Sequence, residues 1–298
     1  MKSFLFNILS LLFICGCVNE ESSTLENRSE DKYYVSVQEF TGESYTLARG
    51  DKTDEIAEEH SEEVNQAVKQ YFKEEYKTEV KIHNIVGAVD GATVFVESIG
   101  KPHFYSYAII PVDKETETVD SKGVWSQEGQ VEAAIISGLY AWINEEKFQK
   151  LAQYVEEKVK EYPIVGISED ANQNGVGNYH TTPYYKLVVY GGVVQDELLD
   201  NYLKNPDRSK DEWVKMLEGE SINPAMVSVL IQLYMDEADV EPDKEIFDQI
   251  VSDLSEMDDL PVGKYSFLLH DNTIDKTNGQ NNKENTLERK APNFIIKE

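Results

Sequence analysis

The sequence contains almost no cysteine, and the two it has lie at one end. Only Cys15 and Cys17 occur among 298 residues. The chain from residue 18 onward therefore has no thiol for a disulfide, a thiolate zinc site, a cysteine nucleophile or redox chemistry. Ordinary packing must stabilise whatever domain this region forms.

Sequence motifs that identify common catalytic sites are also missing. The chain has no Gly-x-Ser-x-Gly, no His-Glu-x-x-His and no glycine-rich loop followed by Gly-Lys-Ser/Thr. These absences argue against the serine hydrolases, zinc proteases and phosphate-loop enzymes that carry such motifs. We therefore expect a protein that is not an enzyme and that needs no cofactor.

Positive charge is scarce. Lys and Arg number 28 against 56 Asp and Glu, which gives a formal net charge of −28. Nucleic-acid binding depends on cations that contact phosphates, so we exclude nucleic acid as a partner. Attraction to anionic lipid headgroups is excluded for the same reason. A solvated acidic surface that keeps an extracellular protein soluble is the simplest interpretation; diffuse cation capture and a basic partner are the alternatives.

Long apolar runs are absent as well, except for a short one at the N-terminus. It follows Lys2, extends from Phe4 to Ile14 and is followed by Gly16 and Cys17. In a helix, residues 4–18 would reach roughly 22 Å, which is less than the ~30 Å hydrocarbon core of a bilayer. A cation, an apolar core and a small residue at the boundary are the pattern of a secretory signal peptide.

A small residue directly before a cysteine at this boundary is the pattern of a bacterial lipobox. We expect residues 1–16 to be the signal peptide and Cys17 to become the lipidated, palmitate-bearing first residue of the mature protein. The lipid would hold the protein on the extracellular face of the cell membrane. An uncleaved anchor and a cytoplasmic protein are the alternatives.

The rest of the chain divides by composition into a tether, two structured parts and a tail. Residues 17–32 are polar and charged, which is typical of a disordered linker. Residues 33–120 carry helical and then β patterns, residues 121–275 mainly helical patterns, and residues 276–298 form a polar tail. The predicted fold class is α+β: an N-terminal helix and a three-stranded antiparallel meander, followed by a mainly helical C-terminal part packed on them.

The N-terminal part has the clearest periodicity. Apolar residues from Ile56 to Phe72 recur at helical spacing and predict a helix over 53–77. Asp90-Gly91 is typical of a tight hairpin between two strands. The predicted strands of the meander span 79–89, 92–99 and 103–112.

Most segments of the C-terminal part have helical spacing. Asn223-Pro224 and Glu241-Pro242 are typical of helix starts, where the missing N–H of proline costs nothing. Periodicity does not decide between strand and helix for residues 184–190. The predicted helices span 127–144, 145–162, 193–204, 210–218, 224–235 and 242–257, and a strand is predicted at 264–270.

Four segments carry a resemblance to a known family. They are Val80–Gly87 (VKIHNIVG), Lys101–Tyr105 (KPHFY), Trp125–Glu132 (WSQEGQVE) and Tyr202–Pro206 (YLKNP). Together they resemble an uncharacterised lipoprotein family of Bacillus- and Staphylococcus-type Gram-positive bacteria, over most of the chain to about residue 275. The resemblance implies a lipid-anchored exported protein, and it implies no reaction, ligand or catalytic residue.

Three histidines are candidates for a metal site. His83 and His103 fall on the first and third predicted strands, and His60 falls on the preceding helix. Imidazole is a common metal ligand. The usual spacings, such as His-x-His, are absent, so three separate structural histidines are the simpler interpretation. We predict no metal site, and His83 and His103 are the residues on which a site would depend.

Glu128 and Glu132 form a pair of carboxylates four residues apart on a predicted helix. Such a pair can bind a cation, or divide into an acid and a base when the environments differ. In so acidic a chain, coincidence is the simpler interpretation. The neighbouring Trp125 is predicted to be a core anchor where the two structured parts meet.

Two turn-rich segments are candidate binding loops. Residues 168–183 carry Asn178, Tyr179 and His180, and loops of this length are either functional or loose. Residues 271–279 resemble a calcium loop but lack the glycine and the closing glutamate of an EF-hand. An Asx-rich turn is therefore predicted there.

These observations predict a lipid-anchored envelope protein with a non-catalytic binding or interaction module. Its partner is either an unknown envelope protein or, as the alternative, a cation or small solute; a cell-wall hydrolase is the third possibility. A deep pocket with convergent polar groups would favour solute binding, whereas a broad exposed apolar patch would favour a protein partner.

Overall fold

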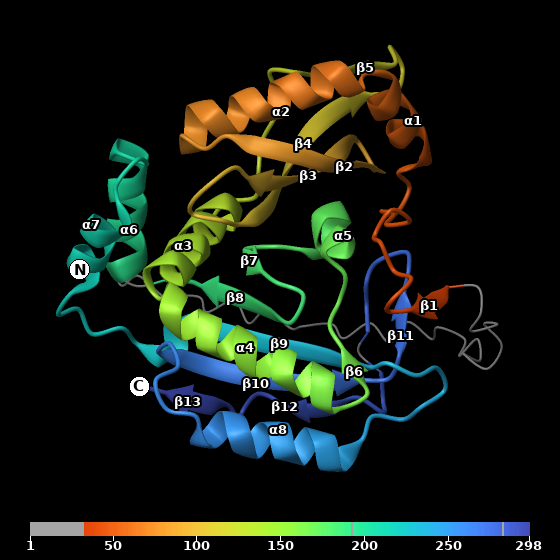
Figure 1. Cartoon of the computed structure of the whole chain (residues 1–298). Coiled ribbons are helices and arrows are strands. Elements are labelled where there is room, and N and C mark those ends of the chain that lie inside the picture. The colour runs from red at the N-terminus through yellow and green to blue at the C-terminus, as the bar shows by residue number, and fades with distance from the viewer. Residues whose placement is uncertain (1–32, 192, 282) are drawn as a thin grey trace, which may run out of the picture. The chain divides into compact units, whose positions relative to one another are not determined.

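Residues 33–191, 193–281 and 283–298 are described by the computed structural model. The predicted signal peptide 1–16 and the tether 17–32, with Cys17, lie outside the described residues. The described part is α+β, with its strands arranged in three sheets (Figure 1). None of the helices in this part is long and apolar enough to cross a membrane.

The N-terminal layer places two helices on a four-stranded antiparallel sheet of order β2-β3-β4-β5. Its elements are α1 (Asp51–Glu59), α2 (Ser61–Tyr76), β2 (Val80–Ala88), β3 (Gly91–Ser98), β4 (Tyr105–Asp113) and β5 (Thr118–Val119). The predicted meander is present, and its first hairpin turns at Asp90-Gly91 with Ala88 paired to Gly91. The single helix predicted over 53–77 is instead two helices that meet at His60.

Glycine is required where α1 approaches β2. A Cβ on Gly87 would lie 2.3 Å from the backbone nitrogen of Asp54, and one on Gly50 would lie 1.9 Å from the Gly87 carbonyl oxygen. Neither position has room for a side chain. The Gly87 N–H donates to Asp54 Oδ1 at 2.6 Å, which fixes the start of α1 on the sheet.

The C-terminal part is built on a sheet, so the predicted mainly helical architecture is wrong. Its strands are β6 (Ile164–Val165), β7 (His180–Thr181), β8 (Tyr185–Val189), β9 (Val227–Met235), β10 (Gly263–His270), β12 (Leu287–Arg289) and β13 (Ile295–Lys297). The main order is β12-β10-β9-β8-β7. β9 and β10 are parallel and are joined by α8 (Lys244–Glu256), as parallel neighbours require a crossover.

The segment 224–235, predicted to be a helix, shows why the architecture differs. Asn223 does cap a helical turn, because its side chain accepts a hydrogen bond from the Ala225 N–H. That turn ends after Pro224–Met226. From Val227 the sequence VSVLIQLYM has a period of two, and the buried side chains alternate with it. The helix-start signal is therefore correct for one turn only.

The tail is ordered by pairing, although its composition predicts a loose polar segment. β12 and β13, both within 276–298, pair antiparallel with β10. β11 (Thr273–Asp275), just before this tail, pairs with β1 (Tyr34–Ser36), the first strand of the described chain. Strands this short carry no period of their own; the free edges they pair with determine their conformation.

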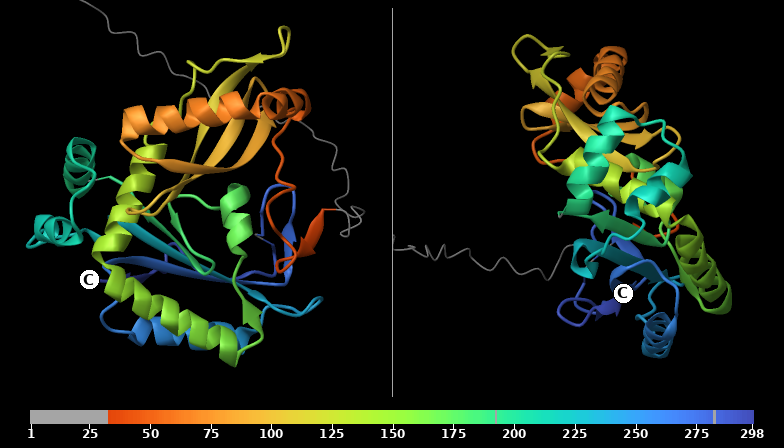
Figure 2. Two further views of the ribbon diagram at one scale, coloured as in Figure 1. Left: turned by 45° about the horizontal axis from the view of Figure 1, so that its top comes forward. Right: turned by 90° about the vertical axis from the view of Figure 1, so that its left-hand side faces the viewer.

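Helices cover one face of the C-terminal sheet (Figures 1 and 2). α3 (Gln130–Ile143) and α4 (Glu145–Glu161) lie there, where helices are predicted, together with α8. Phe148 of α4 stacks on Tyr185 of β8, and Phe247 of α8 stacks on Phe267 of β10. Because side chains alternate along a strand, the next residues, such as Lys186, belong to the opposite face.

The predicted loop 168–183 is structured and contacts both sheets. It contains α5 (Glu169–Ala171), a π-helical turn η2 (Asn172–Val176) and β7. η2 touches β2 and β3, and the Asn84 side chain donates to the Asn174 carbonyl oxygen at 2.9 Å.

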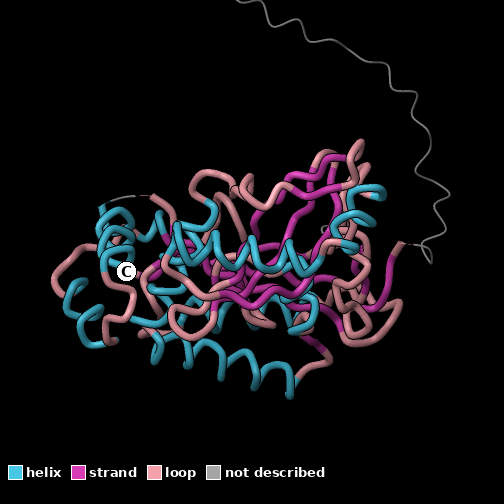
Figure 3. The backbone as a smooth tube through the Cα atoms, turned by 90° about the horizontal axis from the view of Figure 1, so that it is seen from above, coloured by secondary structure: helices cyan, strands magenta, loops and turns pink. Residues whose placement is uncertain are grey.

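In Figure 3 the helices α6 (Val193–Lys204) and α7 (Lys210–Leu217) lie at the opposite end from β1 and β11.

Candidate functional site

The histidine candidates His83 and His103 come together on one carboxylate. His83 Nε2 donates to Glu97 at 2.7 Å and His103 Nε2 donates to the other oxygen at 2.9 Å. A β-bulge between Ile82 and Asn84 leaves His83 without a partner in β3, which directs its side chain toward Glu97. His103 lies in the turn before β4 rather than on the strand itself.

Glu97 is the centre of this arrangement, which we call the histidine cluster: His83, Glu97, His103 and His180. Burial alone would raise the pKa of Glu97, but the hydrogen bonds from His103 and His83 outweigh it and hold the pKa below its ordinary value. The carboxylate therefore stays ionised and holds the two imidazoles in place.

His180 of β7 completes the cluster through the backbone. Its Nδ1 lies 3.0 Å from the His103 carbonyl oxygen, and the two rings are 5.9 Å apart in an edge-to-face arrangement. Burial lowers the pKa of His180 to about 4, so this imidazole is neutral at pH 7. The nearby charges are paired, since Glu145 lies 3.7 Å from Lys101 and 2.8 Å from Lys210.

The cluster does not have the arrangement of a metal site. Within the described ranges, no three His, Cys, Asp or Glu side chains are grouped so as to hold a metal ion. Glu97 uses both oxygens to accept hydrogen bonds from the imidazoles. His60 is not part of the cluster, because its Nε2 lies 3.0 Å from the Glu117 carbonyl oxygen.

The structure separates Glu128 from Glu132. Glu128 is exposed in the turn before α3, whereas Glu132 lies on the helix and accepts a hydrogen bond from the Tyr76 hydroxyl at 3.3 Å. The two carboxylates therefore do not share a helical face. Trp125 is 47% exposed, so the prediction that it is a core anchor is wrong; its backbone pairs with Ile109 of β4.

A cavity of about 160 Å³ opens on the face of the C-terminal sheet opposite to α4 and α8. We call it the lysine cavity. η2, β7, β8, β9 and the segment after β11 all contribute to its wall. Its polar lining residues include Asn172, Thr181, Lys186, Gln232, Tyr234 and Asn281.

Lys186 places a cation in this cavity without a counter-charge. Its ammonium makes one long contact, 3.5 Å to the Val176 carbonyl oxygen, and pairs with no carboxylate in the part of the chain that the structure describes. Burial lowers the pKa of Lys186 below its ordinary value, because desolvation disfavours the charged form. The same residue is only partly enclosed, so the cavity is open to a ligand.

Asn172 adds an unsatisfied amide to the same wall. The residue is 1% exposed, and neither its Nδ2 nor its Oδ1 finds a hydrogen-bond partner among the described residues. Buried amides nearly always have partners, because leaving one unpaired costs about 1–3 kcal/mol. Asn172 opens η2, whose helical backbone is broken at Gly175 (φ +144°).

Sequence reasoning missed this site although a signal for it exists. Lys186 interrupts the apolar run Tyr185–Val189, in a segment whose pattern leaves strand or helix undecided. Asn172 lies in the candidate binding loop 168–183, six residues before the Asn178 of the predicted site. Only the pairing of β8 with β9, which is remote in sequence, brings Lys186 next to Gln232 and Tyr234.

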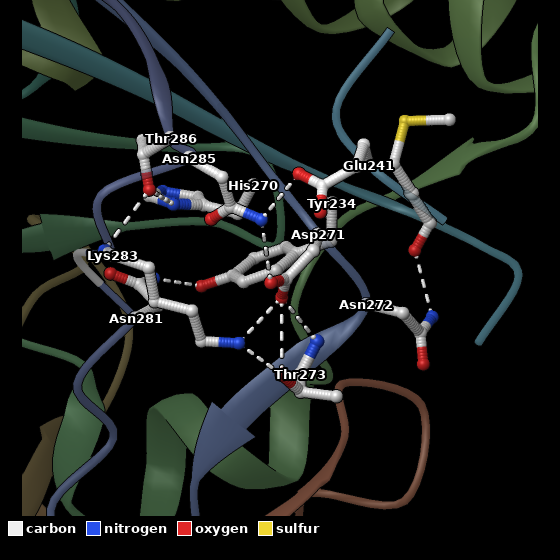
Figure 4. Close-up of polar contacts among 11 residues, drawn as sticks. Tyr234, Glu241, His270, Asp271, Asn272, Thr273, Asn281, Lys283, Asn285 and Thr286 are labelled. Atoms are coloured by element: carbon white, nitrogen blue, oxygen red, sulfur yellow. Dashed lines mark hydrogen bonds and ion pairs between the residues drawn. The ribbon is translucent and has the colours of Figure 1, made fainter. Parts of the chain in front are cut away.

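A polar network beside the cavity attaches the tail to the sheet (Figure 4). Lys283 Nζ lies 2.6 Å from Asp271 Oδ1, which also accepts the Thr273 N–H at 2.9 Å. The Asn281 amide donates to the hydroxyl of Tyr234. The Asx turn predicted for 271–279 is confirmed, and the Lys283 ammonium occupies the position next to Asp271 where a cation would bind.

The comparisons with known proteins agree with the predicted family resemblance. A model of a family described as protein of unknown function, DUF1672, matches residues 27–297. The crystal structure of a DUF1672 family protein from Staphylococcus aureus has a similar fold, with a TM-score of 0.71 at 17% identity, over 89% of this chain and 98% of that one. No curated protein matches the sequence. The resemblance to an uncharacterised family of Gram-positive bacteria is thus confirmed, and the chain belongs to the DUF1672 family.

Proposed function

We propose that this protein is a lipid-anchored binding protein of the cell envelope, and that its folded part holds a small solute without transforming it. The lysine cavity carries the proposal, because a cation without a carboxylate partner and an unpartnered amide both line it. Concave sites with a few convergent polar groups are the usual form of small-molecule sites.

The anchor in this proposal is lipid on Cys17, at the outer face of the membrane. The apolar run and the small residue before Cys17 support it. With a net charge of −28, the protein has no general attraction to anionic headgroups, so acyl chains must supply the membrane affinity. Two chains suffice for stable anchoring, whereas one is marginal.

The sequence alone favours a protein partner, whereas the structure gives more support to a small solute. In the described part, the exposed large apolar side chains are single residues on different elements, and two of them, Tyr190 and Ile296, neighbour Lys264. The exposed side chains are Tyr34, Ile99, Trp125, Tyr190, Val214 and Ile296. A protein interface normally needs a contiguous apolar area, so the enclosed cavity is the better-supported site.

Binding is favoured over catalysis by the chemistry of the cavity wall. Its described lining has amide, hydroxyl and phenol groups and one ammonium, with no carboxylate or imidazole to exchange protons near pH 7. The carboxylate and imidazoles of the histidine cluster bond to one another instead. A cell-wall hydrolase is therefore the less supported alternative.

The anchor is tested by feeding labelled palmitate to a Gram-positive host that expresses either the native chain or Cys17→Ala. We expect label only in the native chain, and we expect Cys17→Ala to release a folded domain into the medium. Label on the Cys17→Ala variant, or none on the native chain, would contradict lipidation at Cys17.

The binding function is tested by thermal unfolding of the purified native chain against a panel of small neutral, cationic and anionic solutes. At least one should raise Tm by several degrees, because a ligand that binds only the native state stabilises it. Val176→Phe, which fills the cavity, should abolish that shift while circular dichroism remains native. A panel without any shift would contradict the binding function.

A further inference from the structure

The lysine cavity has a charge opposite to that of the molecule as a whole. The chain has 56 acidic residues, yet none of the described lining residues is Asp or Glu, and one is lysine. A random sample of this surface would place carboxylates around the opening. The cavity therefore favours an anion in a protein that otherwise repels anions.

The position of Lys186 requires a partner that the described chain does not supply. A carbonyl oxygen at 3.5 Å is too distant for a strong hydrogen bond to an ammonium. A carboxylate at normal ion-pair distance would replace the lost hydration and form a charge-assisted hydrogen bond, which is about twice as strong as a neutral one.

The Asn172 amide indicates which hydrogen-bonding groups the ligand carries besides its charge. An amide presents a donating NH2 group and an accepting oxygen whichever way it is oriented, and both groups are unpartnered here. A ligand that satisfies both must accept one hydrogen bond and donate another. A bare carboxylate accepts only, so the ligand also needs a donor group.

The donor on the ligand is a hydroxyl rather than an ammonium. A second cation next to Lys186 would have no lining carboxylate to neutralise it. A hydroxyl donates without adding charge. Tyr234 and Gln232 add neutral groups suited to a hydroxyl, and burial raises the pKa of Tyr234 to about 12, so its phenol keeps the proton.

The volume of about 160 Å³ limits the ligand to a few heavy atoms. A cavity of ~150 Å³ holds a molecule the size of benzene. From charge, hydrogen-bonding capacity and size together, we infer that the lysine cavity binds a small hydroxycarboxylate. Its carboxylate pairs with Lys186, and its hydroxyl donates to the buried Asn172 amide, which turns toward the cavity to accept it. This inference rests on the proposed binding function and adds the chemical class of its ligand.

The test is isothermal titration of the full chain in detergent with four probes of nearly equal size. Lactate has a carboxylate and a hydroxyl, propionate lacks the hydroxyl, propane-1,2-diol lacks the charge, and alanine replaces the hydroxyl by an ammonium. Lactate should bind most tightly, and each of the others should bind at least ~10-fold more weakly, since each leaves one buried group unpaired.

Two variants and one control locate the site. Lys186→Met should weaken lactate binding ~50-fold by removing a charge-assisted hydrogen bond, and Asn172→Asp should weaken it by a similar factor through repulsion. Lys264→Met is the control, because Lys264 lies over Tyr190 and Phe294 and does not line the cavity. It should bind lactate like the native chain.

The outcomes separate the ligand class from the binding function. Equal binding of lactate and propane-1,2-diol, or lactate affinity that Lys186→Met leaves unchanged, would overturn the hydroxycarboxylate. If all four probes fail while another solute raises Tm, the ligand class is wrong and the binding function stands. If no solute of either experiment binds, both are overturned and the cavity holds only water.

Discussion

The histidine cluster and the lysine cavity treat buried charge in opposite ways. In the cluster, both oxygens of the Glu97 carboxylate accept a hydrogen bond from an imidazole. In the cavity, the Lys186 ammonium and the Asn172 amide have no adequate partner among the described residues. Satisfied polar networks rigidify a fold, whereas unsatisfied groups cost stability. The comparison supports a structural role for the cluster and the proposed binding role for the cavity.

The largest expected change in stability comes from the histidine cluster, whose polar groups are hydrogen-bonded. Glu97→Ala leaves His83 and His103 without their acceptor and should lower the free energy of unfolding by about 3 kcal/mol at pH 7. Because the folded pKa of Glu97 is depressed, its contribution is present above the unfolded pKa of about 4.5 and is lost as pH falls through the folded pKa. Urea unfolding at pH 7 and at pH 3 measures both.

Glu79→Ala is the matched control for Glu97. Glu79 also lies beside β2 and is paired with Lys73 at 3.2 Å, but its side chain is 67% exposed. An exposed ion pair contributes about 0–1 kcal/mol, so its loss should be small. Equal effects of the two substitutions would break the distinction between a structural cluster and ordinary surface charge.

The second largest expected change is a pH-dependent loss of stability that arises from a buried imidazole near the lysine cavity. His270 is 1% exposed beside Asp271 and Lys283, and burial lowers its pKa to about 4. Protons therefore bind the unfolded chain first as pH falls from about 6.5, and stability declines in that range. His270 should account for a loss of roughly 2 kcal/mol between pH 8 and pH 5.

Replacing His270 by Asn removes the titrating group and checks this decline. The unfolding free energy of His270→Asn should fall less steeply between pH 8 and pH 5 than that of the native chain. Parallel curves would mean that His270 is not the group that titrates.

The smallest expected change is a gain in stability, from replacing Lys186. Lys186→Met removes an unpaired, partly buried charge and should raise the unfolding free energy by about 1 kcal/mol at pH 7 in the absence of ligand. The folded pKa of Lys186 is depressed, so the cost of its charge is full below that pKa and disappears as pH rises toward the unfolded value of 10.5. Chemical unfolding at pH 7 and pH 10 would show a shrinking difference, and destabilisation at pH 7 would contradict an unpaired charge.

The part of the fold that depends on local signals could be predicted from sequence. The hairpin at Asp90-Gly91 and the helices 127–144 and 145–162 follow from turn chemistry and periodicity within a few residues. The C-terminal sheet could not, because β9 and β10 pair across α8, and β12 and β13 depend on an edge that only the folded chain provides.

The candidate sites divide in the same way. His83 and His103 could be selected as residue types, but Glu97, which joins them, has no pattern of its own in an acid-rich chain. Lys186 and Asn172 are ordinary until tertiary structure brings them to one cavity, where Lys186 has a single long contact and the Asn172 amide has none among the described residues. Desolvation is a property of the assembled fold, so no spacing rule predicts it.

The central claim is that Lys186 has no counter-charge until an anion binds in the lysine cavity. The most direct test is the pKa of Lys186, measured by NMR of lysine labelled at Cε. The signal is assigned by its loss in Lys186→Met. In the free protein Lys186 should titrate below 10.5, and saturating lactate should raise its pKa, because a bound carboxylate stabilises the ammonium. A free-protein pKa at the ordinary value that lactate leaves unchanged would contradict the assignment of the lysine cavity as the binding site.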